Sequence, residues 1–280
     1  MIARLLARRA TVIGLAIVAT LALVALLAPW IAPHDPTLVN AGRGFAGPSA
    51  RHWLGTDNLG RDILSRLVYG ARWSLGIVLV ATLLIMSLGV AVGVAAGYVG
   101  GVLDDVLMRL VDAILSVPSL LLGLAIVGSL GPGIGSLMIG LASVWWVGYA
   151  RVVRGLVLAL RERGFVEAAR ALGATDRRIV VHHILPSILP AVAVLASLEM
   201  GELVLAISGL SFLGLGAQPP TAEWGAMLND GRAFFFTAPQ LMLYPGLVIS
   251  FAVLGFNLVG DGLRDALDPA DASRMEGVGA

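Results

Sequence analysis

Long apolar runs alternate with short polar segments along most of this chain. A helix that crosses a bilayer needs about 20 mainly apolar residues at 1.5 Å each, because lipid offers no partners for free backbone groups. Six stretches meet this length, and they predict an all-α integral membrane protein with six transmembrane helices. Their approximate ranges are 10–32, 73–98, 106–130, 134–153, 187–210 and 240–260.

The polar segments divide the chain into three parts. Residues 1–72 hold the first span, a polar outer loop and an amphipathic segment, residues 73–265 hold five spans and a long inner loop at 154–186, and residues 266–280 form a tail. The first apolar run is longer than the core of a signal peptide, so we expect an anchor that is not cleaved. Thirteen of the nineteen arginines fall on the side that carries both ends of the chain, which predicts that both termini are cytoplasmic.

The residue inventory excludes several kinds of chemistry. Hydrophobic residues make up 58% of the chain and charged residues 13%, and the net charge of +1 gives no basic field for nucleic acid. There is no cysteine, which removes thiolate metal sites and cysteine nucleophiles, and all 19 basic residues are arginine. A phosphate-binding loop needs the lysine of its G-x-x-x-x-G-K-S/T pattern. We therefore expect a membrane protein that is not an enzyme, does not hydrolyse ATP and binds no cofactor itself.

The segment before the second span has its own periodicity. Leu59, Ile63 and Leu67 recur near helical spacing while charged residues take the other face. This pattern predicts an amphipathic helix that lies on the membrane surface. Asp57 stands where it could cap that helix.

Two shorter patterns inside the spans predict helix contacts. In the second span, Gly89, Gly93 and Gly97 place three positions without side chains on one face, which is typical of close helix packing. The packing partner is either another helix of this chain or another subunit. At the start of the third span, Arg109 and Asp112 are three residues apart and predict an ion pair near the headgroups.

The inner loop at 154–186 mixes acidic residues with arginines, which predicts a solvated helical surface. Strong helix formers predominate from Glu167 onward, Gly173 ends that run, and Thr175 can cap a second short helix before Pro186. Two short helices joined at a glycine predict a compact knob that docks onto another protein. A passive connector between spans is the alternative.

Several sequence motifs match one known family. "EAARALG" at 167–173 followed by "HHILP" at 182–186 resembles the EAA motif of ABC importer permeases, although His183 stands where the general motif has isoleucine. Four further segments resemble the C-type subunit of the dipeptide/oligopeptide/nickel permease family. They are "HWLGTDNLGRDILSRLVYGAR" at 52–72, "LSFLGLGAQPP" at 210–220, "WGAMLNDGR" at 224–232 and "FNLVGDGLRDALDP" at 256–269.

The resemblance implies a set of partners and a location. It implies a type I ABC importer transmembrane fold in the bacterial inner membrane, paired with a second related permease and two cytoplasmic ATPase subunits that bind ATP and magnesium. It also implies an extracytoplasmic solute-binding protein, for which residues 211–239 and the segment after Asp57 are candidate docking or gating surfaces.

The EAA motif assigns a role to four residues of the inner loop. By resemblance, Glu167, Ala168, Ala169 and Gly173 couple the permease to an ATPase, since each permease of such an importer places this knob in a cleft of the ATPase.

Two acidic residues stand inside the fifth span. Glu199 and Glu202 lie three residues apart on one helical face, and a charge at the middle of a membrane costs about 2.5–3.5 kcal/mol. Both should therefore face protein or water. They are candidates for lining the translocation path, and a structural bond to the partner permease is the alternative.

The cargo is less well defined by the sequence. The family resemblance favours di- or oligopeptides, whereas "LEMGE" at 198–202 looks more like nickel-transporting members and keeps nickel or a metal chelate as an alternative. None of the four histidines lies in the middle of a span, so we expect no metal ligands on the path. An ion-coupled secondary carrier with Glu199 and Glu202 as its ion site is the alternative from a different class.

Overall fold

The computed structural model describes residues 8–267, and these are almost entirely helical, with no strand beyond an isolated bridge between Thr56 and Asp62. Five helical segments are long and apolar enough to cross a membrane, and a bent pair makes a sixth. The elements are α2 (Arg9–Ile31), η1 (Ala41–Arg43), α3 (Ile63–Val99), α4 (Gly101–Leu115), α5 (Ser119–Leu130), α6 (Ile134–Val144), α7 (Trp146–Arg161), α8 (Gly164–Ala171), α9 (Asp176–Ile179), η2 (Val180–Ile184), α10 (Leu185–Phe212), α11 (Trp224–Arg232) and α12 (Gln240–Leu267).

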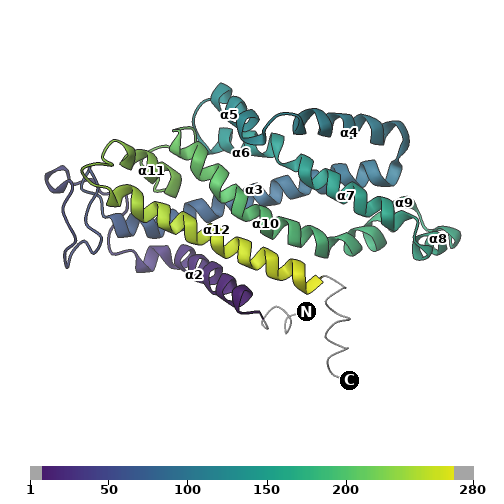
Figure 1. Ribbon diagram of the computed structural model, residues 1–280, viewed down its shortest axis with the longest axis horizontal. Coiled ribbons are helices and arrows are strands. Elements are labelled where there is room, and N and C mark those ends of the chain that lie inside the picture. The colour runs from purple at the N-terminus through teal and green to yellow at the C-terminus, as the bar shows by residue number, and fades with distance from the viewer. Residues whose placement is uncertain (1–7, 268–280) are drawn as a thin grey trace, which may run out of the picture.

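The long helices form an elongated bundle with different structures at its two ends (Figure 1). One end, the loop end, carries the α2–α3 loop (residues 32–62) and α11. The opposite end, the knob end, carries α8 and α9. Arg8 forms an ion pair with Asp265, so the first residue of the described chain lies beside the last turns of α12. The predicted tail at 266–280 lies almost wholly outside the described residues, and the cytoplasmic location of both termini stays a prediction.

The centre of the bundle is the contact between α3 and α7. A Cβ atom added at Gly89 would lie 2.7 Å from the carbonyl oxygen of Trp146, and one at Gly93 would lie 2.6 Å from that of Ala150. A Cβ at Gly97 would lie 2.9 Å from the carbonyl oxygen of Arg154. All three glycines therefore face α7 of the same chain, which settles the choice between packing within the chain and a contact with another subunit.

The third predicted span is not one helix. Residues 106–130 divide into α4 and α5, whose axes differ by 87°. The break falls between Leu115 and Ser119, just before and at Pro118. Proline has no N–H to donate and disfavours the helical conformation in the residue before it, so it interrupts an otherwise apolar run.

The predicted ion pair between Arg109 and Asp112 is also wrong. Asp112 instead pairs with Arg151 of α7, and Asp104 of α4 binds Arg154 through both carboxylate oxygens. The two aspartates thus tie α4 to the neighbouring helix rather than pairing along their own helix.

The amphipathic segment differs from the prediction as well. No separate surface helix forms, because α3 begins at Ile63 and continues without a break through the second span. Its cap is Asp62, whose side chain accepts a hydrogen bond from the backbone N–H of Ser65. Asp57 closes a turn in the loop, where it accepts hydrogen bonds from the backbone N–H groups of Leu59 and Arg61.

We predict that Gly93→Ala lowers the stability of the folded chain. The new methyl group would meet the backbone of Ala150 and the side chain of Val153, so α3 and α7 would have to separate, at a cost of about 1–3 kcal/mol. Thermal unfolding of the purified protein in detergent measures the effect. Gly76→Ala is the matched control, because it lies in the same helix with nothing within 4 Å of an added Cβ. Equal melting temperatures for the two variants would contradict the packing argument.

Candidate functional site

The predicted knob exists, and we use this name for residues 164–179. It consists of α8 and α9, joined at Gly173, whose φ of +79° favours glycine, and Thr175 caps α9 by accepting a hydrogen bond from the N–H of Arg178. The second helix does not stop before Pro186. Instead, α9 continues through the π-helical turn η2 into α10, and Pro186 is accommodated in the first turn of α10.

The knob is anchored on one side and open on the other. The side chains of Val166 and Ile179 are fully buried in the core, and the Tyr98 hydroxyl at the end of α3 donates a 2.6 Å hydrogen bond to Asp176. On the open side Glu167 and Ala168 are exposed, and Leu172 is 89% exposed. An anchored base with an exposed apolar and acidic surface can dock into a cleft of another protein.

The four residues of the EAA motif share this open side to different degrees. Glu167, Ala168 and Gly173 are exposed, and Ala169 is half-buried against the core. An added Cβ at Gly173 would meet nothing within 4 Å, so the backbone angle, not crowding, accounts for glycine there.

Glu199 and Glu202 have different surroundings, although both lie on α10. Glu199 is half-buried, with one carboxylate oxygen directed at the space that Gly148 of α7 leaves free, next to Tyr149. Glu202 is exposed on the outside of the isolated chain. Of the two, Glu202 presents more of its side chain to a partner or to water.

At the loop end, α11 is fixed to α3 by buried polar contacts. The carboxylate of Glu223 is fully buried, caps α11 through the N–H groups of Gly225 and Ala226, and accepts a hydrogen bond from Ser74 of α3. The Trp224 indole donates a 3.1 Å hydrogen bond to the carbonyl oxygen of Leu67. The segment 211–239 thus has a rigid base, and its Phe236 side chain is 94% exposed.

A buried ion-pair network holds the α2–α3 loop against α11. Arg61 binds Asp57 at 2.6 Å and Asp230 at 3.1 Å, and Arg66 reaches the same Asp230 oxygen at 3.1 Å. The two arginines and Asp57 are almost completely buried, whereas Asp230 is partly exposed. The network joins the loop, the first turn of α3 and α11 in one contact.

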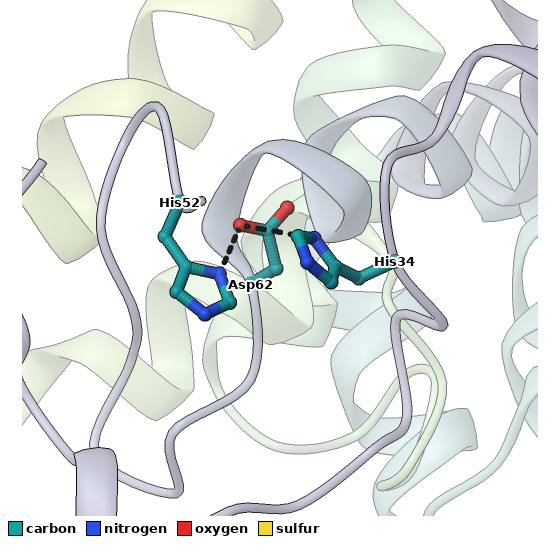
Figure 2. A group of neighbouring side chains, drawn as sticks. All are labelled: His34, His52 and Asp62. Carbon is teal, nitrogen blue, oxygen red and sulfur yellow. Dashed lines mark hydrogen bonds and ion pairs between the residues drawn. The ribbon is translucent and has the colours of Figure 1, made fainter. Parts of the chain in front are cut away.

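The same loop contains a second cluster, which was not predicted from the sequence. It consists of His34, His52 and Asp62 (Figure 2). Nδ1 of His52 lies 2.9 Å from Oδ1 of Asp62, and Nδ1 of His34 lies 3.8 Å from the same oxygen. Burial alone would raise the pKa of Asp62, but hydrogen bonds from Ser65 and His52 and the charge of His34 offset this and lower it. If Asp62 had been recognised as the residue that caps α3, its carboxylate would have been expected beside the preceding loop, which contains both histidines.

Two segments of the chain match known protein families. Residues 89–270 match the family described as "Binding-protein-dependent transport system inner membrane component". The chain belongs to this family. Residues 1–48 match the "N-terminal TM domain of oligopeptide transport permease C". The chain is thus an ABC importer permease of the peptide/nickel group, a multi-pass inner membrane protein, and the ion-coupled carrier has no support.

Curated relatives of this permease carry different cargo names. It is 45% identical to the nickel transport system permease protein NikC of Escherichia coli K12, over 92% of this chain and 93% of that one. It is 44% identical to the dipeptide transport system permease protein DppC of Alkalihalophilus pseudofirmus, over 92% and 85%. It is also 44% identical to the glutathione transport system permease protein GsiD of Escherichia coli O6:K15:H31, over 89% and 82%. Near-equal identities do not resolve the cargo.

A solved structure supports the fold of this permease. The inward-facing MetNI methionine ABC transporter aligns with a TM-score of 0.55 at 22% identity, over 74% of this chain and 98% of that one. At this level of identity the likeness concerns the fold alone. It confirms the predicted type I ABC importer architecture.

We predict that Asp57→Ala destabilises this permease by about 3 kcal/mol. Removing one partner of a buried ion pair leaves an uncompensated charge, and here two buried arginines would share Asp230 alone. Thermal unfolding and limited proteolysis of the α2–α3 loop measure the change. Asp35→Ala is the control, because Asp35 is an exposed residue of the same loop whose side chain, within residues 8–267, bonds only Thr37. Similar loss of stability in both variants would refute the network's role.

Proposed function

We propose that this permease forms half of the translocation pathway of an ATP-driven importer and couples to a cytoplasmic ATPase through its knob. The other half is a second related permease, and ATP and magnesium bind to two separate ATPase subunits. The knob end and both termini face the cytoplasm, and the loop end receives cargo from an extracytoplasmic solute-binding protein. The placement of knob and loop at opposite ends of the bundle supports this arrangement (Figure 1).

The single observation that carries the coupling role is the shape of the knob. Its base is held by buried Val166 and Ile179 and by the hydrogen bond from Tyr98 to Asp176. These contacts attach the knob firmly to the helix bundle. Its open side presents Glu167 to a partner. Closure of an ATPase pair around two such knobs becomes a rigid-body movement of the helices attached to them.

For the cargo, we propose di- or oligopeptides as the first candidate, in line with the dipeptide and glutathione names of two relatives. Nickel or a metal chelate is the second candidate. It is favoured by the name of a third relative.

The path itself is proposed to include Glu202 rather than Glu199. Glu202 is exposed on α10 and is therefore available to the partner permease or to cargo, whereas Glu199 is directed at α7 of its own chain.

The coupling role predicts that Glu167→Lys strongly reduces ATP-dependent uptake without reducing the amount of permease in the membrane. The side chain is exposed, so its replacement disturbs docking rather than folding. The measurement is uptake into proteoliposomes that contain both permeases and the ATPases, with the binding protein outside and ATP inside. Labelled di- and oligopeptides are compared with nickel and chelated nickel, and the cargo that accumulates identifies the branch.

The matched control for this experiment is Glu162→Lys, which reverses an exposed charge just before the knob. We expect it to transport like the wild type. Full uptake by the Glu167 variant would exclude the coupling role, and uptake without any ATPase would exclude the importer mechanism as a whole.

The path proposal predicts that Glu202→Gln raises the cargo concentration needed for half-maximal uptake several-fold, with an unchanged melting temperature. The Glu202 side chain is exposed and makes no hydrogen bond or ion pair within residues 8–267, so its replacement breaks no contact of the fold and a loss of transport reports on cargo or on the partner permease. Glu199→Gln, one helical turn away, is the comparison and should leave that concentration unchanged. The reverse pattern would place Glu199 on the path instead.

A further inference from the structure

The cluster in the α2–α3 loop brings together three side chains that are far apart in the sequence. His34 follows α2, His52 lies in the middle of the loop, and Asp62 caps α3, yet one ligand atom from each lies within 4.8 Å of the other two. The two imidazole rings face each other with centroids 4.6 Å apart and the Asp62 carboxylate beside them (Figure 2). The side chain of Asp62 is 1% exposed, that of His52 13% and that of His34 32%.

The surrounding hydrogen bonds orient these groups in advance. Oδ2 of Asp62 accepts bonds from both the backbone N–H and the hydroxyl of Ser65, which leaves Oδ1 directed at the two imidazoles. The backbone N–H of His34 donates a 3.0 Å bond to the same Ser65 hydroxyl. Ser65 thus holds both Asp62 and the backbone of His34 in place. Residues in this supporting position orient the ligands of many protein metal sites.

The hydrogen bonding of the cluster is incomplete without a further partner. Nδ1 of His34 is buried and has no hydrogen-bond partner within residues 8–267. Asp62 Oδ1, at 3.8 Å, is too far for a hydrogen bond and is already bonded to His52. A buried ring nitrogen without a partner costs free energy, and a bound cation would remove that cost.

The distances suit a bound metal ion. Nitrogen and oxygen ligands of zinc-like ions lie about 2.1 Å from the metal, so two ligand atoms on one ion lie at most about 4.2 Å apart. The separations of 2.9 Å and 3.8 Å from Asp62 fall within that limit. The two imidazole nitrogens lie within 4.8 Å of each other, so the rings have to move closer together for all three donors to meet one ion.

The donor set and its access define the class of ion. Two imidazoles and one carboxylate suit nickel, zinc and copper, whereas calcium and magnesium prefer oxygen ligands alone. Three protein ligands leave further coordination positions open for water or a chelating molecule. His34 also borders a cavity of about 660 Å³ at the loop end, whose lining includes Tyr69 and Trp73, so an ion can reach the His34 side of the cluster from this cavity.

We propose that His34, His52 and Asp62 bind one divalent transition-metal ion of the nickel, zinc and copper class at the loop end of the permease. The ion joins the segment after α2, the middle of the loop and the first turn of α3. Binding does not depend on ATP or on transport, so the proposal stands apart from the identity of the cargo.

The test is metal binding by the full-length permease, co-expressed with its partner subunits, purified through a tag without histidine and placed in lipid nanodiscs. After chelator treatment, nickel or zinc chloride is titrated by calorimetry without ATP or cargo. We expect one ion per chain at micromolar affinity or better. His34→Ala and His52→Ala should each weaken binding at least tenfold, whereas His182→Ala, an exposed histidine at the knob end, should bind like the wild type.

A second measurement avoids variants altogether. X-ray absorption at the nickel or zinc edge of the wild-type complex should show two imidazole ligands and oxygen ligands. No stoichiometric binding below millimolar metal, unchanged affinity in both histidine variants, or a spectrum without imidazole would overturn the proposal. Each of these results would mean that His52 and Asp62 form an ordinary hydrogen bond in the loop.

Discussion

The backbone contact between α3 and α7 is the constraint on which the rest of the structure depends. Because Gly89, Gly93 and Gly97 carry no side chains, the two helices approach until one backbone touches the other. With 37 residues, α3 is about 55 Å long, well beyond the roughly 30 Å of a bilayer core. Its two ends therefore lie outside the lipid, where Asp62 orders the α2–α3 loop and Tyr98 holds the knob.

The sequence predicted those features that depend on local chemistry. Apolar runs of membrane length, the glycine face, the helix end at Gly173 and the cap at Thr175 each follow from a few neighbouring residues, and the structure has all of them. Proline at 118 was an equally local signal for the break in the third span. The segments on both sides of Pro118 are mainly apolar, so the hydropathy pattern shows one long run. That pattern gives the length of an apolar segment but not the direction of the helix axis.

The features that the sequence could not predict depend on which helices become neighbours. Asp112 bonds Arg151 because α4 lies on α7, a choice that spacing within one helix cannot reveal. Glu199 and Glu202 share a face by spacing, yet only one is covered, since the space at Gly148 opens opposite Glu199 alone. The histidine cluster likewise needs the loop to fold back over 28 residues, from His34 to Asp62.

The unbroken helix from Asp176 to Phe212 has a mechanical consequence. Half of the knob and both intramembrane glutamates belong to one rod, with Asp176 about 35 Å from Glu199 along its axis. The π-helical turn and Pro190 lie between them, yet the helix continues past both without ending. A torque applied at the knob therefore reaches the middle of the membrane as a turn of the same rod, and needs no relay of side chains to carry it.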